Sequence, residues 1–231
     1  MLSDVTCHSV AQVLQWIANN TSRSALFRGQ SDAEWLLESR IARIPGGTSL
    51  ERALLQEFQR RSQPYLEREP KNMVEWLALG QHFGLATRLL DWTTSPLAAL
   101  WFAVREHETH ATDARLWVLT PDRTITASCT NHSLIENPFS LTTPALIHAP
   151  HLATRITAQN SCFILQPSNP SHTRFVPLDS LDNLVDSLVV PAGCLQGIRE
   201  ELDRCGINEV SLFPGLDSLA RHVVWRATEH C

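Results

Sequence analysis

Hydrophobic and polar positions along the chain follow patterns typical of both helices and strands. The helical spacing of Val10, Val13, Leu14 and Ile17 predicts an amphipathic first helix over residues 9–19. Further helices are predicted over residues 48–66, 73–83, 178–188, 194–205 and 216–225. Short apolar runs predict strands at 25–30, 115–120, 155–166 and 189–191, and 35–37 is a second short strand or a turn. We therefore expect an α+β fold with a mixed, mostly antiparallel sheet, split around a ligand cleft and packed with helices.

The stretch over residues 81–104 has the highest concentration of candidate functional side chains in the chain. Its first half is rich in His, Thr, Arg and Asp, and its second half is apolar on every face, which predicts a helix buried all round. Ser95 followed by Pro96 is a typical helix start. The free N–H groups at this amino end would suit an anionic ligand such as a phosphate. The alternative is that Arg88 and Asp91 form a structural salt bridge beneath a core helix.

Composition describes an ordinary globular protein. Of the 231 residues, 43% are hydrophobic and 19% are charged, which allows a sizeable core and excludes a disordered chain. The formal net charge of -5 argues against a general basic surface for nucleic acid, although it permits a local basic cleft. We expect one domain over residues 1–231, with a helical part up to about residue 83 and a sheet-rich remainder.

Cysteines, histidines and the amino end exclude several classes of protein. The six cysteines are scattered singly without a CxxC pair, and the ten histidines form no HExxH pattern, so no metal site is expected. No apolar run approaches the length of a transmembrane helix, and the first residues lack the regions of a signal peptide. We expect a cytoplasmic protein without a membrane partner.

Several segments of the chain resemble a known family. The tetrapeptide FRGQ at 27–30, the run QHFGLATRLLDWT at 81–93 and the following SPLAALWFA resemble the FRG domain, a bacterial family named for its Phe-Arg-Gly motif. The segment 208–220 is similar to the closing segment of that family. The resemblance therefore covers nearly the whole chain.

The same residues are similar, more weakly, to ADP-ribosyltransferases of the Arg–Ser–Glu class. Residues 27–29 are similar to the Tyr-Arg-Gly or Phe-Arg-Gly motif on the first strand of that class, and 93–95 to its Ser-Thr-Ser motif. This resemblance implies an ADP-ribosyltransferase-like fold and an enzyme that transfers ADP-ribose from NAD to a protein or nucleic acid. It further implies a toxin or anti-phage effector, with an antitoxin or accessory protein as a candidate partner.

The resemblance also implies roles for individual residues. Arg28 would grip phosphate or ribose oxygens in a fork that lysine cannot reproduce, and Gly29 would let the ligand approach the backbone. Ser95 or Thr94 would hold the nicotinamide ribose. The expected NAD-binding residues are Arg28, Gly29, Gln30, Thr87, Arg88, Thr94, Ser95 and Gln159.

The chain departs from the transferase pattern at one point. That class carries a glutamate on a late strand, whereas the strand that would align here, 155–161, is neutral; Gln159 can hydrogen-bond a ribose hydroxyl but supplies no charge. Glu209 and Asp91 are the remaining acids, and His82 is either an acid–base group or a satisfied core histidine. The candidate catalytic residues are Arg28, His82, Asp91 and Glu209.

Three functions stay open at this point. The leading one is ADP-ribosyl transfer from NAD. The second is a non-catalytic module that binds a nucleotide or a nucleic-acid end in the same cleft, favoured by the missing glutamate. The third is hydrolysis of NAD or a nucleotide with His82 and Asp91 as the working pair. The structural alternative for Arg28 is an ion pair with Asp91 or Glu38.

Overall fold

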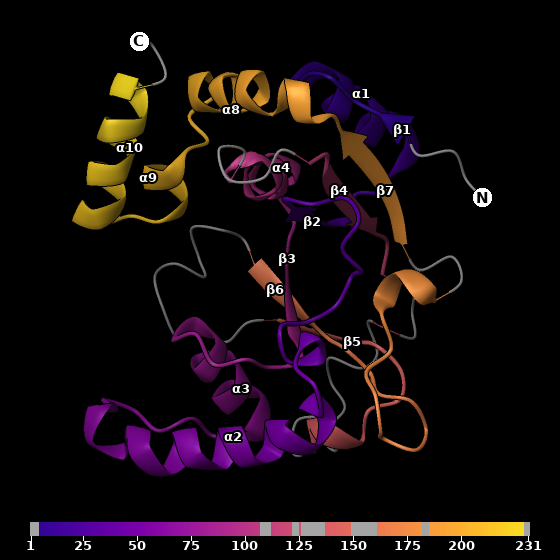
Figure 1. Ribbon diagram of the computed structural model, residues 1–231, viewed down its shortest axis with the longest axis vertical. Helices are drawn as coiled ribbons and strands as arrows, with labels where there is room; N and C mark the ends of the chain where they lie inside the picture. The colour runs from indigo at the N-terminus through magenta and orange to yellow at the C-terminus, as the bar shows by residue number, and fades with distance from the viewer. Residues whose placement is uncertain are drawn as a thin grey trace.

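A mixed seven-stranded sheet runs through the centre of the computed structural model, which describes residues 5–106, 112–121, 125, 137–148, 161–181 and 185–228 (Figure 1). Its strands are β1 (Val5–Thr6), β2 (Leu26–Gln30), β3 (Leu89–Thr93), β4 (Ala114–Leu119), β5 (Ala145–His148), β6 (Ser161–Leu165) and β7 (Val185–Val190). Their order is β1-β7-β4-β2-β3-β6-β5, and among these strands β1 and β7 are parallel while the other neighbours are antiparallel. The predicted α+β class with a mixed, mostly antiparallel sheet is confirmed.

Helices begin where the sequence provides capping side chains. The α-helices are α1 (Val10–Asn20), α2 (Gly47–Ser62), α3 (Met73–His82), α4 (Pro96–Val104), α8 (Leu195–Arg204), α9 (Glu209–Leu212) and α10 (Leu216–Thr228). The side chains of Ser9, Asn72 and Ser95 accept a hydrogen bond from the first turns of α1, α3 and α4. Gly206 ends α8 with a φ of 78°, in the left-handed region that favours glycine.

The prediction of a helix over residues 178–188 is wrong. The structure has a 3-10 turn at Leu178–Ser180 and then strand β7, which lies between β4 and β1 and pairs with both. Pairing with distant strands overrides the local spacing, because β structure depends on its neighbours more than on its own sequence. Residues 35–37 form no strand, and the described part of the strand expected at 155–166 is β6.

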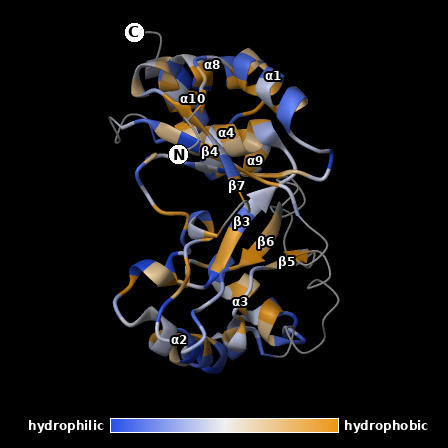
Figure 2. Cartoon of the chain, turned by 90° about the vertical axis from the view of Figure 1, so that its right-hand side faces the viewer, coloured by the Kyte–Doolittle hydropathy of each residue, from blue (hydrophilic) through white to orange (hydrophobic). Residues whose placement is uncertain are grey.

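The sheet is continuous, but its weakest junction lies between β2 and β3. These two strands pair through a single residue pair, Phe27 with Thr93, and diverge beyond it. The strands from β1 to β2 carry α1, α4 and α8, whereas β3, β6 and β5 carry α2 and α3, which gives two lobes (Figures 1 and 2). Each lobe has its own apolar cluster beneath its helices. The part up to residue 83, predicted to be helical, also supplies β1 and the central strand β2.

Helix α4 packs directly on β2, and Gly29 permits the contact. Six of its nine residues are buried and the other three are partly exposed. A Cβ at position 29 would lie 2.0 Å from the carbonyl oxygen of Ala99 and 2.5 Å from the amide nitrogen of Ala103, both backbone atoms of α4. Close packing of α4 therefore requires glycine at position 29. The expected role of Gly29 in the close approach of a ligand to the backbone stays a prediction.

Replacing Gly29 with alanine is expected to lower the free energy of unfolding by about 1–3 kcal/mol, because α4 must move away from β2. Gly197→Ala is the matched control: position 197 is an exposed site in α8 where no described atom lies within 4 Å of an added Cβ. Urea unfolding of both variants measures the difference. Equal midpoints for Gly29→Ala and the wild type would contradict the tight contact.

Candidate functional site

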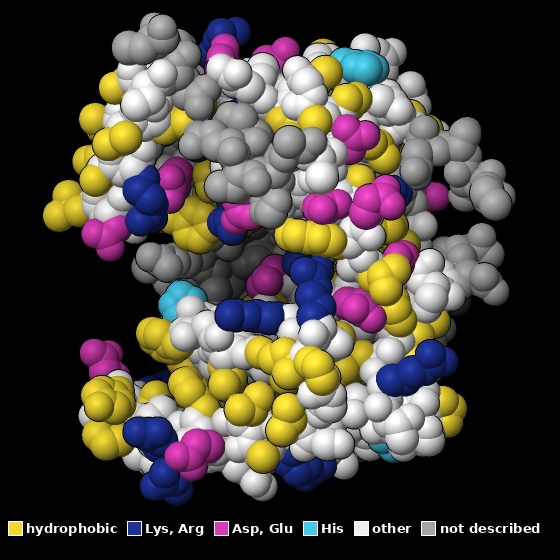
Figure 3. Space-filling view, viewed as in Figure 1, with side chains coloured by type: hydrophobic (Ala, Val, Ile, Leu, Met, Phe, Trp, Pro, Cys, Tyr) yellow, Lys and Arg dark blue, Asp and Glu magenta, His cyan; other side chains and the backbone are white. Residues whose placement is uncertain are grey.

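A pocket of about 560 Å³ lies between the two lobes, where the space-filling surface is hollowed (Figure 3). Its volume falls within the range of roughly 300–1,000 Å³ that is usual for small-molecule sites. Its lining residues are Phe27, Arg28, Gly29, Gln30, Ser31, Trp35, Glu38, Arg40, Arg43, Asp91, Trp92, Thr93, Ala99, Phe102, Arg105, Glu106 and Phe213. Four arginines and three carboxylates give this lining a formal charge of +1, opposite in sign to the chain as a whole.

The pocket is built by the divergence of β2 and β3. Side chains alternate between the faces of a strand, so Arg28 and Gln30 point to one face of the sheet. Through the Phe27–Thr93 register, Asp91 and Thr93 point to the other face. All four residues line the pocket, which therefore reaches both faces through the opening between the strands.

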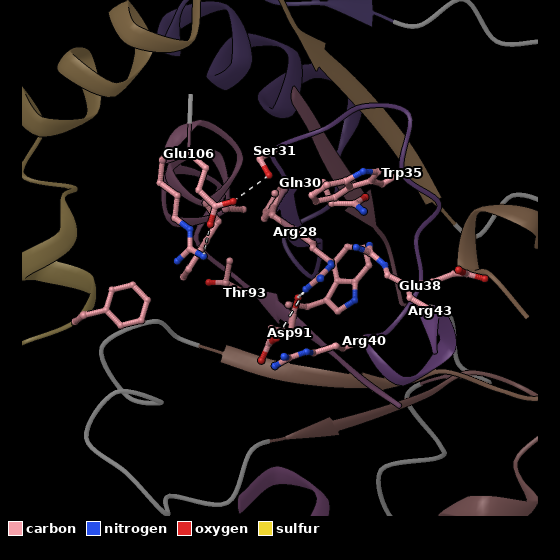
Figure 4. Close-up of a pocket in the computed structure, with 17 residues that line it drawn as sticks. Arg28, Gln30, Ser31, Trp35, Glu38, Arg40, Arg43, Asp91, Thr93 and Glu106 are labelled. Carbon is pink, nitrogen blue, oxygen red and sulfur yellow. Dashed lines mark hydrogen bonds and ion pairs between the residues drawn. The ribbon is translucent and has the colours of Figure 1, made fainter. Parts of the chain in front are cut away.

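Arg28 spans the gap between the strands. Its Nη1 donates to the backbone oxygen of Asp91 at 2.8 Å and lies 3.9 Å from Oδ2 of the same residue (Figure 4). Its side chain is 21% exposed, and burial lowers the pKa of the guanidinium although Asp91 opposes this shift. The ion pair with Asp91, which was the structural alternative for Arg28, is therefore present, but it engages one terminal nitrogen of the guanidinium.

Two buried donors at the pocket have no acceptor among the described residues. They are Nε of Arg28 and the indole Nε1 of Trp92, and both residues line the pocket. A buried donor without a partner costs roughly 1–3 kcal/mol, so such groups in a native structure call for an explanation. An acceptor-rich ligand in the pocket would supply one.

Two side chains, Thr87 and Gln81, orient the Asp91 carboxylate. The Thr87 hydroxyl donates to the amide oxygen of Gln81, and the amide nitrogen of Gln81 lies 3.0 Å from each carboxylate oxygen of Asp91. The Thr87 contact fixes which end of the Gln81 amide faces the carboxylate. Thr87, expected to contact NAD, is buried and contacts the amide of Gln81, which was not among the predicted site residues. The side chain of Asp91 is 61% exposed at the pocket.

Further pocket residues come from the segment after β2 and from the end of α4. Burial raises the pKa of Glu38, with a smaller contribution from Asp179, whereas Arg43 acts in the opposite direction. Glu106 accepts hydrogen bonds from Arg105 at 2.8 Å and from the Ser31 hydroxyl at 3.4 Å. Sequence reasoning left these residues out, apart from Glu38 as a partner for Arg28. The sequence signal that could have found part of this set is the pair Arg40 and Arg43, which follows the Phe-Arg-Gly motif within fifteen residues.

Gln30 lines the pocket but is engaged by the protein itself. Its amide oxygen accepts from the indole of Trp117, and its amide nitrogen donates to the backbone oxygen of Leu36 at 3.2 Å. The residue as a whole is 5% exposed. Gln30 therefore fixes the segment that follows β2 against the sheet, and the orientation of this amide serves the wall of the pocket.

Arg88 is a structural residue, which corrects its expected role in binding NAD. Its guanidinium donates to Glu51 at 2.9 and 2.7 Å and to the backbone oxygen of Pro138 at 2.8 Å, and both charged side chains are at most 2% exposed. The guanidinium also lies over the rings of Phe139 and Phe175. The expected partner of a structural pair, Asp91, is thus replaced by Glu51 of α2.

The remaining predicted site residues lie outside the pocket lining. Ser95 caps α4, and neither it nor the exposed Thr94 lines the pocket; Thr93 does so in their place. His82 is exposed at the end of α3, which excludes a core histidine. Glu209 forms an ion pair with Arg221 in the C-terminal helices. Gln159 lies outside the described residues.

The described residues contain no group of three or more His, Cys, Asp or Glu side chains that could hold a metal ion. Within the same residues, no helix has both the length and the apolar character needed to span a membrane.

Comparisons with known proteins give one match. Residues 23–112 match the family model of the FRG domain, a stretch that includes β2, β3, α4 and all pocket residues except Phe213. The match is shorter than the coverage expected from the sequence motifs and leaves out the segment 208–220. No curated protein and no solved structure matches the chain.

Proposed function

We propose that the pocket binds NAD and that the protein transfers its ADP-ribose group to a macromolecular acceptor, a protein or a nucleic acid. The observation that carries this proposal is the pair of buried, unpartnered donors, Arg28 Nε and Trp92 Nε1, at a pocket with three further arginines. Phosphate oxygens and ribose hydroxyls are acceptors of the kind that these donors require. The similarity of residues 27–29 and 93–95 to the transferase motifs supports the same function.

Two pocket residues would support cleavage of the nicotinamide–ribose bond: a carboxylate beside the ribose and an arginine that binds the phosphates. The bond breaks as positive charge develops on the ribose, as in glycoside hydrolysis, and a fixed carboxylate beside the sugar stabilises that charge. Asp91 is such a carboxylate, because Gln81 orients it at the pocket. Arg28 would bind the negatively charged pyrophosphate of NAD, next to the ribose whose bond to nicotinamide breaks.

The direct test measures two products from NAD labelled in the adenine ring and incubated with the purified protein and cell extract. Nicotinamide release together with label in a macromolecular fraction is the expected result. Arg28→Lys keeps the charge but removes the fork, and it is expected to weaken NAD binding about tenfold. Arg23→Lys, at an exposed position before β2, is the control. Absence of both nicotinamide and transferred label would refute the enzyme.

A second function, non-catalytic binding of a nucleotide, is favoured by one observation. The segment 155–161, which the resemblance aligns with the late strand that carries the glutamate in transferases, has no acid in its sequence. Calorimetry with NAD, followed by analysis of the recovered ligand, separates the two functions: intact NAD after binding supports the module, and free nicotinamide supports the enzyme.

A further inference from the structure

The pocket has two ends, and the first combines an aromatic ring, an arginine and a carboxylate. The guanidinium of Arg43 lies over the ring of Trp35, 4.9 Å from its centroid. Glu38 lies at the same end (Figure 4). All three residues belong to the segment that follows β2. This end therefore presents a flat aromatic ring and guanidinium, and Glu38 adds a carboxylate to its lining.

The opposite end repeats this combination with residues from other elements. Arg105 lies over the ring of Phe102 at 5.4 Å, and Phe213 meets Phe102 edge to face with ring centroids 5.8 Å apart. Glu106 accepts a hydrogen bond from Arg105 at 2.8 Å and lies far from Trp35 across the pocket (Figure 4). The second end is thus formed by the last turn of α4 and by the residue after α9.

Between the two ends lie the residues suited to phosphate. Arg28 and Thr93 occupy the middle of the pocket in Figure 4, with Asp91 and Arg40 on one side. The unpartnered Nε of Arg28 belongs to this central part. The order along the pocket is therefore ring and carboxylate, then arginine, then ring and carboxylate.

We propose that the pocket is a dinucleotide site, which takes one nucleoside at the Trp35 end and the other at the Phe102–Phe213 end. Bases stack on aromatic rings and on guanidinium planes, carboxylates accept hydrogen bonds from ribose hydroxyls, and an arginine fork binds the bridging phosphates. The inference rests on the proposed function, since NAD is one such dinucleotide. It adds that both ends must be filled for tight binding and that a mononucleotide fills one of them.

Calorimetry with diadenosine diphosphate, NAD and AMP tests the two-ended pocket. Diadenosine diphosphate is expected to bind at least about tenfold more tightly than AMP, the amount that one additional stacked base contributes. Trp35→Ala and Phe213→Ala are each expected to weaken the dinucleotide about tenfold, while only one of the two variants weakens AMP. Tyr65→Ala, at an 85% exposed position outside the pocket, is the matched control.

Phe213 also packs against Trp101, so its replacement can disturb the fold. Arg105→Ala changes the same end at an exposed residue and leaves the ring in place. The same loss of dinucleotide affinity is expected from it. The proposal would be overturned if AMP and the dinucleotide bound with equal affinity, or if none of the three ligands bound. It would also be overturned if substitutions at only one end of the pocket weakened the binding of both AMP and the dinucleotide.

The outcome is distinguishable from that of the proposed function. Tight binding of diadenosine diphosphate through both ends, without nicotinamide release from NAD, supports the two-ended pocket and refutes the transferase. Nicotinamide release combined with equal affinities for AMP and the dinucleotide supports the enzyme and refutes the two-ended pocket.

Discussion

Replacing Glu51 with glutamine is expected to lower the free energy of unfolding by roughly 3–5 kcal/mol, the cost of leaving a buried charge without its partner. The Arg88 side chain is 2% exposed, and its charge is offset by Glu51 at 2.7 Å. Glutamine keeps the shape of the side chain and removes the charge. For a chain of this length the loss corresponds to a melting temperature lower by on the order of 10 °C, measured by calorimetry.

Two comparisons separate the buried pair from ordinary surface charges. Glu57→Gln removes an exposed partner of Arg60 on the same helix and is expected to leave the melting temperature unchanged. The double variant Glu51→Leu with Arg88→Met replaces the pair by apolar groups and is expected to recover much of the lost stability. If Glu51→Gln melts like Glu57→Gln, the buried pair is not a determinant of the fold.

The same variant separates structural and functional roles of Arg88. Because the guanidinium lies in the lobe core and not in the pocket, Glu51→Gln is expected to leave NAD affinity unchanged at temperatures where the protein is folded. A large change in NAD affinity in a folded Glu51→Gln variant would instead indicate that Arg88 takes part in NAD binding.

Asp91→Asn is expected to reduce nicotinamide release from NAD by roughly 10²–10³-fold, because the variant removes the charge that stabilises the developing oxocarbenium ion. The fold should persist, since Asp91 is exposed and asparagine still offers an oxygen to the Gln81 amide. NAD affinity is expected to change little, so the loss lies in kcat. Steady-state kinetics combined with calorimetry on the same preparations measures both quantities.

Variants of the other acids test whether Asp91 is the carboxylate that stabilises the positive charge on the ribose. Glu38→Gln and Glu106→Gln change carboxylates that line the same pocket, and Asp186→Asn changes an exposed carboxylate on β7. We expect the largest loss for Asp91→Asn and none for Asp186→Asn. A larger loss for Glu38→Gln or Glu106→Gln would transfer the role of the charged group to that residue.

The motif run 81–93 shows how far sequence reasoning reached. The run was predicted to form part of a binding site, and the structure places Asp91 and Thr93 of that run in the pocket lining. It could not separate Arg88 from Asp91, since both are charged residues three positions apart. The difference arises because Arg88 lies just before β3 and turns toward α2, whereas Asp91 lies within β3 beside Arg28.

Several of the pocket residues that were not predicted lie on a segment without regular periodicity. Trp35, Arg40 and Arg43 belong to the segment between β2 and α2, whose only regular structure is a single 3-10 turn at Ile41–Arg43. Its sequence has no periodicity from which the direction of a side chain can be inferred. Phe213 reaches the pocket from the opposite end of the chain, through its packing on Phe102. Only the three-dimensional structure shows that these residues line the pocket.

The sequence by itself determined the start of α4 at Ser95 and Pro96, the apolar helix that follows and the mostly antiparallel α+β class. These features are local, since capping, periodicity and short motifs act over a few residues. The tertiary structure decided that Gly29 serves a helix and that Arg88 pairs with Glu51. It also decided that Arg28, Asp91 and Trp35 share one cavity. Such facts depend on contacts between residues far apart in the chain, which the divergence of β2 and β3 brings together.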